Sequence, residues 1–314
     1  MKALPASEIS NPNHRRVWKS VLKNWRLYVM LAPVILYFLV FHYWPMYGVQ
    51  LAFKDFIATN GIFGSPWVGF KHFERFFDSY YFWRLIKNTL SIGLYELAVG
   101  FPIPIILALM INEVRHKFYK RLIQTVTYMP HFLSTVVLVG MIMIFLAPET
   151  GIVNQVIKLF GGEPIRFMTE PEWFKSIFVM SGVWQHMGWS SIIYLAALSG
   201  IDPQLHEAAR VDGASRLQRI WHINIPGIMP TIVILLILKA GSILGVGFEK
   251  VFLMQNSLNM ESSDVISTFV YRSGMLEAQY SFATAVDLFN SVINFILLVT
   301  VNFIARRAGG SSLW

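Results

Sequence analysis

Long stretches without charged residues constrain the fold of this chain more than any other feature. Three stretches contain no Asp, Glu, Lys or Arg: residues 27–53, 122–148 and 176–201. Three more contain a single one each: Glu96 in 88–112, Lys239 in 220–248 and Asp287 in 278–305. Each stretch exceeds the ~20 residues that a helix needs to cross a bilayer, whereas transmembrane β-strands are alternating segments of ~10 residues. The sequence therefore predicts an all-α integral membrane protein with six transmembrane helices.

The segments between the spans divide the chain in a simple way. The predicted spans are residues 27–47, 88–111, 122–146, 176–198, 228–248 and 282–304. Segments rich in aromatic and turn residues join the spans on one side, and we expect them to form ordered caps at 48–84, 149–174 and 250–280. We therefore expect three parts: a basic N-terminal segment over 1–26, one transmembrane permeation domain over 27–304, and a tail over 305–314.

The charges that do occur predict the orientation. Only 14% of the residues are charged, against ~25% in an average soluble domain. Lysines and arginines gather in the N-terminal segment, in the second-to-third and fourth-to-fifth links, and in the tail. Such segments stay in the cytoplasm, and the first apolar stretch is too long for a cleaved signal peptide. We expect both termini to be cytoplasmic, and the net charge of +8 to reflect orientation and anionic lipid, not nucleic acid.

The link between the fourth and fifth spans, residues 201–226, has unusually clear helix boundaries. Asp202 followed by Pro203 is typical of a helix start, and Gly213 is typical of a helix end. A capping-box pattern at Ser215–Gln218 predicts a second start. The sequence therefore predicts two short helices joined at Gly213 on the cytoplasmic side.

The same link carries a spaced motif. It consists of Glu207-Ala208-Ala209, three residues, Gly213, nine residues, Ile223, one residue and Ile225-Pro226. This resembles the EAA motif of permease subunits in binding-protein-dependent ABC importers, with Ile225 in place of the usual leucine. In that family the motif forms a coupling helix that docks on an ATP-binding subunit. The resemblance implies that the ATPase-coupling residues are Glu207, Ala208, Ala209, Arg210, Asp212 and Gly213.

Other segments extend the resemblance over nearly the whole chain after residue 27. They resemble the oligo- and polysaccharide branch of the family, and alginate importers in particular: residues 101–113, 188–195, 246–251, 279–286 and 288–294. The resemblance implies a type I ABC importer permease fold, a location in the bacterial inner membrane, and transport by alternating access. It also implies four kinds of partner: a second homologous permease, two ATP-binding subunits, a periplasmic solute-binding protein and membrane lipids.

The sequence shows no catalytic constellation. It contains no Walker A run, so we expect ATP and magnesium to be bound by the partner ATPase subunits and no cofactor by this chain. HExxH and GxSxG motifs are absent, and the eight histidines show no ligand spacing. Without cysteine there is no disulfide bond or cysteine-ligated metal. We expect neither a metal site nor an enzyme.

Polar residues within the spans are candidates for the substrate pathway, because ionisable groups in a membrane usually face the bundle interior or an aqueous cavity. Aromatic faces suit the C–H surfaces of sugars, and amides and charges suit their polar groups. The predicted pathway residues are Trp184, Gln185, His186, Trp189, Tyr194, Lys239, Asp287, Asn290 and Asn294. In the alternative interpretation, Lys239 and Asp287 pair with each other or with the partner subunit and serve structure alone.

These observations favour import of an oligo- or polysaccharide, with alginate as the leading candidate. The alternative within the family is a neutral oligosaccharide. A proton-coupled secondary transporter would not need the EAA link, but Glu96 and Asp287 could bind its protons. A membrane-embedded glycan-processing enzyme would need the catalytic motif that the sequence lacks.

Overall fold

The computed structural model describes residues 23–307, 312 and 313. Most of the predicted N-terminal segment over 1–26 and part of the predicted tail over 305–314 therefore lie outside the described residues. The chain divides into two compact units, Met1–Leu51 and Ala52–Trp314. Within the described ranges there is no β-sheet, and Lys54 and Trp67 form an isolated antiparallel bridge.

In the first unit, a helix begins at Trp25 with α2 (Trp25–Phe38) and continues through the π-helical turn η1 (Leu39–Tyr43). The 3₁₀ helix η2 (Trp44–Phe53) follows it across the unit boundary. Together they form 29 residues that are long and apolar enough to cross a membrane. This is the first predicted span, 27–47.

In the second unit, three more helices pass the same test of length and composition. One is Phe82–Glu113, built from α5 (Phe82–Tyr95), the π-helical turn η3 (Glu96–Gly100) and α6 (Pro102–Glu113). The other two are Arg216–Ala240 and α17 (Tyr280–Arg307). The described residues thus hold four such helices, or five if a strongly bent pair counts as one span.

The bent pair replaces the straight third span predicted over 122–146. The segment Lys117–Phe132, made of α7 (Lys117–Tyr128) and η4 (Met129–Phe132), meets α8 (Thr135–Phe145) at 101°. Leu133 is extended, and the Ser134 hydroxyl accepts a hydrogen bond from the Val137 N–H at 3.3 Å, so a new helix starts there. The apolar composition predicted the span but not this break.

The sixth long helix, α10 (Pro171–Ser199), has 29 residues, but its most apolar stretch is less apolar than those of the four helices above, and it has the polar residues Gln185 and His186 in its middle. It occupies the predicted fourth span, 176–198, and packs against α6, α7 and α13 (Ile225–Ala240). At Gly188 the approach is so close that a Cβ atom would lie 2.0 Å from the Thr127 carbonyl oxygen. α10 is therefore the central packing element of this unit.

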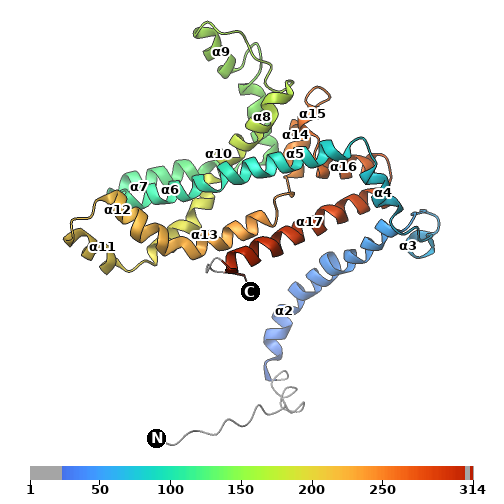
Figure 1. The fold of residues 1–314 in the computed structure, drawn as a ribbon, viewed down its shortest axis with the longest axis horizontal. Coiled ribbons are helices and arrows are strands. Elements are labelled where there is room, and N and C mark those ends of the chain that lie inside the picture. Colours follow the sequence, from blue (N-terminus) through green and yellow to red (C-terminus); the bar gives the residue numbers. More distant parts are fainter. Residues whose placement is uncertain (1–22, 308–311, 314) are drawn as a thin grey trace, which may run out of the picture. The chain divides into compact units, whose positions relative to one another are not determined.

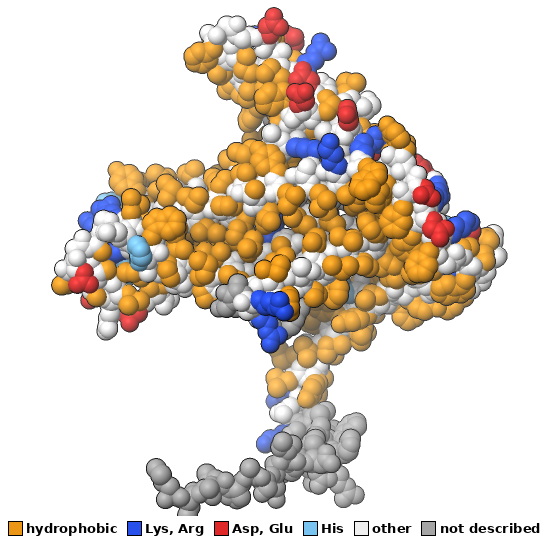
Figure 2. Space-filling model, viewed as in Figure 1, with side chains coloured by type: hydrophobic (Ala, Val, Ile, Leu, Met, Phe, Trp, Pro, Cys, Tyr) orange, Lys and Arg blue, Asp and Glu red, His pale blue; other side chains and the backbone are white. Residues whose placement is uncertain are grey.

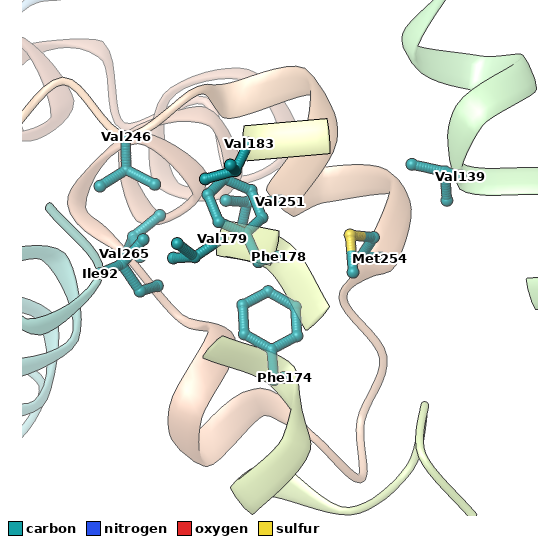
Figure 3. Packing of buried hydrophobic residues seen from close by; sticks show 10 residues of the cluster. All are labelled: Ile92, Val139, Phe174, Phe178, Val179, Val183, Val246, Val251, Met254 and Val265. Atoms are coloured by element: carbon teal, nitrogen blue, oxygen red, sulfur yellow. The ribbon is translucent and has the colours of Figure 1, made fainter. Parts of the chain in front are cut away.

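Buried apolar side chains hold α10 in place. Figure 3 shows its residues Phe174, Phe178, Val179 and Val183 between Ile92 of α5 on one side and Met254 and Val139 on the other. A second cluster joins α6, α10 and α13 through Leu109, Tyr194 and Ile228, among others. A third joins α4, α5, α16 and α17 around Phe76.

Short helices order the three predicted caps, as expected. They are α3 (Gly61–Gly64), α4 (Lys71–Phe77), α9 (Ile152–Leu159), α14 (Phe248–Met254), α15 (Met260–Ser263), α16 (Ile266–Tyr271) and the π-helical turn η6 (Arg272–Leu276). Asp264 links them to a span, because it is fully buried and forms ion pairs with Arg84 of α5 at 2.9 Å and Arg272 at 3.1 Å.

Within the second unit, Figure 1 shows α5 and α6 lying end to end and α17 passing near α13. Hydrophobic side chains cover most of the face that Figure 2 shows over α5, α6, α7, α13 and α17. Charged side chains gather near α11 and α12 at one end and near α4 and α14–α16 at the other. An apolar middle between charged ends is the pattern expected of a helical unit that crosses a bilayer.

Candidate functional site

A cavity of about 360 Å³ lies between α10, the α5–α6 helix and α13. Most of the side chains that line it are apolar. Five carry hydrogen-bonding groups: Glu96, His186, Ser190, Tyr194 and Lys239. Three of these, His186, Tyr194 and Lys239, are predicted pathway residues. The structure thus brings together residues from three helices that are far apart along the chain: the α5–α6 helix, α10 and α13.

The charged groups of this cavity are paired. Lys239 Nζ lies 2.7 Å from Glu96 Oε1, and both side chains are about two-fifths exposed, at 43% and 37%. Glu96 starts the π-helical turn η3, which ends just before Pro102. Pro102 has no N–H for the regular helical hydrogen bond, so the helix is irregular where Glu96 projects. The pairing makes two ionisable groups tolerable at this depth.

A second cavity, of about 300 Å³, shares Glu96, Gly182 and His186 with the first. It also contains Lys250, whose side chain is almost fully buried. Lys250 Nζ donates a hydrogen bond to the Phe178 carbonyl oxygen at 2.8 Å and lies 4.7 Å from the centre of the Phe178 ring. The two cavities therefore adjoin at His186, and each has a lysine on its wall: Lys239 in the first and Lys250 in the second.

His186 is held from the other direction by the bent third span. Its Nδ1 lies 3.2 Å from Nδ1 of His131, so one ring donates a hydrogen bond to the other. His131 stacks on Trp189, with ring centres 4.5 Å apart and planes within 5°. Trp189 thus supports His131 and does not line either cavity. The hydrogen bond to His131, which is itself stacked on Trp189, fixes the orientation of the His186 ring at the point where the cavities meet.

The other predicted residues of α10 are divided between packing and the second cavity. Gln185 is buried, lines the second cavity, and donates a hydrogen bond from Nε2 to the Leu133 carbonyl oxygen at 3.0 Å. That bond gives the Leu133 carbonyl oxygen, which lies at the break between η4 and α8, a hydrogen-bond donor. Trp184 is 42% exposed and lines neither cavity.

The three predicted residues of α17 are not part of this site. Asn294 Oδ1 accepts a hydrogen bond from the Leu244 N–H at 3.2 Å, which ties α17 to the residues after α13. Asn290 Oδ1 is buried without a hydrogen-bond partner among the described residues. Asp287 is exposed on the surface of the chain, and its side chain makes no ion pair or hydrogen bond within the described part. The α17 residues therefore form a separate group.

The alternative in which Lys239 pairs with Asp287 is wrong for this chain, because the partner of Lys239 is Glu96. The sequence offered both carboxylates as single charges within spans. It could not choose between them, since the choice depends on which helices are neighbours.

The predicted coupling helix is α11 (Pro203–Val211). Asp202 Oδ1 accepts a hydrogen bond from the Gln204 N–H at 2.9 Å, which caps the helix as expected. After it, Gly213 has a positive φ of 76°, a conformation that costs side-chain-bearing residues roughly 1–2 kcal/mol. The capping box of Ser215 and Gln218 is present in α12 (Arg216–Arg219).

The second helix of this link is longer than predicted. α12 continues through the π-helical turn η5 (Ile220–Asn224) into α13, and Arg216–Ala240 is one helix of 25 residues. The helix then ends at Ala240, whereas the fifth span was predicted to reach residue 248. Pro226 and Pro230 do not separate the two parts, because the helix continues through both; the π-helical turn η5 just before Pro226 accommodates the hydrogen bond that its missing N–H cannot form.

None of the predicted coupling residues is buried. Glu207, Ala208, Arg210, Asp212 and Gly213 are exposed, and Ala209 is half-buried. Apolar side chains nearby are also exposed, including Leu205 at 53% and Leu217 at 69%. A cleft of about 330 Å³ lies beside α11, lined in part by Glu207, Arg210 and the buried Arg219. Exposed apolar and polar groups on a defined helix are suited to contact with another protein.

Lys250 is the cavity residue that the sequence reasoning missed. It was assigned to an outward segment, because the fifth span was predicted to end at residue 248. The signal was a Glu-Lys pair, Glu249 and Lys250, between the apolar residues 246–248 and 251–254. Among the described residues, no group of three or more His, Cys, Asp and Glu side chains could hold a metal ion.

Comparisons with known proteins agree with the geometry. Residues 100–310 match the family described as "Binding-protein-dependent transport system inner membrane component". The chain is 42% identical over 312 residues to the polygalacturonan/rhamnogalacturonan transport system permease protein YteP of Bacillus subtilis (strain 168), covering 99% of this chain and 97% of YteP.

Two crystal structures are also similar to the whole chain. One is of a bacterial ABC transporter involved in the import of the acidic polysaccharide alginate, with a TM-score of 0.87 and 46% identity over 93% of this chain and 99% of that one. The other is of a bacterial alginate ABC transporter in complex with an alginate pentasaccharide-bound periplasmic protein. Its TM-score is 0.88 and its identity 44%, over 95% of this chain and 100% of that one.

Proposed function

The chain belongs to the family of binding-protein-dependent transport system inner membrane components, and on that premise we propose that it imports a saccharide chain rich in carboxylate groups. It is a permease subunit in the inner membrane and not an enzyme. Membership implies a second permease subunit, ATP-binding subunits and a periplasmic binding protein. ATP and magnesium belong to the ATP-binding subunits in such systems.

The names of similar proteins support an acidic substrate. Alginate is named as an acidic polysaccharide in one similar structure, and YteP is named for polygalacturonan, which is a polymer of galacturonic acid. Both polymers carry one carboxylate on each uronic acid ring. We propose alginate as the first substrate to test and oligogalacturonate as the second.

The observation that carries the proposal is the pair of adjoining cavities with Lys239, His186 and Lys250 on their walls. A carboxylate in a site of low dielectric needs a cation or several N–H groups to replace its water. Glu96 holds Lys239 when no substrate is present. A substrate carboxylate would share the ammonium group of Lys239, while Tyr194 and Glu96 would bind hydroxyl groups.

Coupling to ATP is assigned to the exposed residues of α11. We propose that Glu207, Ala208, Ala209 and Arg210 contact an ATP-binding subunit, and that Asp212 and Gly213 set the angle at which the chain leaves this contact. α12, η5 and α13 form one continuous helix up to Lys239. A displacement of the link would therefore be carried directly to a wall of the cavity, which is the mechanical need of alternating access.

The first prediction concerns Lys239. Replacing Lys239 with methionine should reduce uptake of an oligogalacturonate about ten- to hundredfold, because a charge-assisted hydrogen bond contributes about 1.5–3 kcal/mol. Uptake of the methyl-esterified oligomer of equal length should fall much less. The measurement is uptake into proteoliposomes that contain the complete transporter, with the binding protein outside.

Two further variants interpret this result. K239M leaves the carboxylate of Glu96 without its cation, and the double variant K239M/E96Q replaces that carboxylate with a neutral amide. The double variant should therefore assemble normally, even if K239M assembles poorly, while the preference for the acidic oligomer stays lost. The variant K158M changes a lysine of α9 that lies outside both cavities, and uptake should be unaffected. Equal losses for the acidic and esterified oligomers in K239M would assign Lys239 to structure alone.

A further inference from the structure

A third cavity opens at the outer end of the second unit, where the three predicted caps meet. Its volume is about 1160 Å³, more than three times that of the cavity beside Lys239. The walls come from the first turns of α5 and α10 and from residues 257–262. Typical sites for drug-sized ligands have volumes of ~300–1,000 Å³. This outer groove is therefore large enough for a chain of several sugar rings.

Two aromatic side chains on the outer groove are almost fully exposed. Tyr80 is 86% exposed and Trp83 is 76% exposed. Exposed aromatic side chains on a concave surface are available to contact a ligand. Their flat faces fit the C–H faces of sugar rings, and their O–H and N–H groups can bind hydroxyls.

The ionisable groups of the outer groove are largely without partners. Lys87 lies one helical turn after Trp83, on the same side of α5, and its side chain has no ion pair or hydrogen bond within the described residues. Lys175 Nζ donates a hydrogen bond to the Ser91 hydroxyl at 2.7 Å, and the described residues provide no carboxylate partner for it. Two ammonium groups on one groove, neither in an ion pair within the described residues, can each form a charge-assisted contact with an anion.

Two carboxylates also line the outer groove. Glu172 and Glu261 are exposed, and neither side chain makes an ion pair or hydrogen bond within the described part of the chain. They are acceptors for hydroxyl groups. The groove thus offers cations for carboxylates, acceptors for hydroxyls and rings for apolar faces, which are the three kinds of surface that a polyuronate presents.

We propose that the outer groove is a binding site for an acidic saccharide chain, with Lys87 and Lys175 binding its carboxylates and Trp83 and Tyr80 contacting its rings. The proposal rests on the proposed function, since it adds a site at the outer face for the same class of substrate. A chain longer than the cavities within the membrane would have part of its length held here while the rest enters. The concave form and the recessed Lys175 favour a flexible chain over the flat surface of a docking protein.

The test uses the complete transporter with its ATP-binding subunits in nanodiscs, without the binding protein. Equilibrium dialysis measures binding of a labelled galacturonate hexamer and of its methyl ester. The double variant K87Q/K175Q should bind the hexamer about tenfold more weakly, because two charge-assisted contacts are lost at a partly exposed site. The single variant K87Q removes a charge that has no partner within the described residues, so it should not disturb folding. A smaller loss of hexamer affinity in K87Q would show that misfolding does not explain the loss in the double variant. The matched control K158Q changes a lysine outside the groove and should bind normally.

The outcomes separate this proposal from the others. W83A should weaken binding of the hexamer and of the ester alike, because its ring contacts the sugar face and not the carboxylate. Wild-type affinity in K87Q/K175Q, or equal binding of hexamer and ester by the wild type, overturns the proposal. Loss of affinity for the sugar-free binding protein, with hexamer binding intact, also overturns it and assigns the groove to protein docking. If the wild type binds the hexamer as expected but imports no acidic saccharide, the proposed function fails and the groove stands.

Discussion

Replacing Asp264 with alanine should destabilise the assembled permease by about 3–5 kcal/mol, because the change leaves two arginines near a buried site without their carboxylate. Asp264 is fully buried, and Arg84 and Arg272 lie 2.9 and 3.1 Å from its Oδ2. Its backbone carbonyl also accepts a hydrogen bond from Asn88 at 3.1 Å. The loss should appear as a lower midpoint in denaturant titration and in thermal unfolding of the complex.

The matched control is D55N. Asp55 is more than one-third exposed, and its ion pair with Lys71 is short at 2.6 Å. The hydrogen bond from Lys71 holds the pKa of Asp55 below its ordinary value. Asp55 also lies 3.0 Å from Nε2 of the buried His72. Asparagine keeps a side-chain oxygen as an acceptor, and pairs in contact with water contribute less than about 1 kcal/mol, so D55N should have little effect on the midpoint. Equal shifts for D264A and D55N would show that the Asp264 cluster does not hold the caps to α5.

The second large effect is expected at Gly213. Replacing it with alanine puts a Cβ atom on a residue whose φ is 76°, although no atom lies within 4 Å of that position. The cost is therefore one of backbone conformation and not of collision, about 1–2 kcal/mol. Relief of this strain turns the link after α11, so ATPase activity should no longer rise with the loaded binding protein. Uptake should fall at least about tenfold, while expression and assembly persist.

Two variants separate conformation from other causes. G213N should retain most of the coupling, because asparagine adopts positive φ more readily than other residues with a side chain. G200A changes the glycine just before this link, at the end of α10; its φ is −84° and its added Cβ would make only an ordinary contact, so it should behave like the wild type. If G213A and G200A show the same coupling, α11 is not the coupling helix.

Local signals in the sequence predicted the fold and one of the candidate regions well. Charge-free stretches identify the long helices, because a helix in lipid satisfies its own backbone hydrogen bonds and charged side chains are costly there. The Asp202 cap, the Ser215 capping box and the positive φ of Gly213 were all predicted, since each depends on a few neighbouring residues. The 101° break of the third span was not predicted, because apolar composition carries no information on direction.

Contacts between distant residues were the part that the sequence could not supply. Glu96 and Lys239 are 143 positions apart. Their pairing depends on how their two helices pack against α10, which contacts both. The ion pairs of Asp264 with Arg84 and Arg272 likewise depend on how the caps pack against α5. Lys250 was assigned to an outward segment, yet it lines a cavity with His186. Charges within or beside spans mark candidates, and packing decides which of them share a site.

The most direct test of the account measures uptake of labelled alginate oligosaccharide by proteoliposomes that contain both permease subunits and the ATP-binding subunits. The account predicts uptake only with ATP inside and the loaded binding protein outside, unchanged by a protonophore, and much lower for a neutral oligosaccharide of equal length. Uptake that persists without ATP and collapses with the proton gradient would contradict it, as would equal uptake of the neutral oligosaccharide.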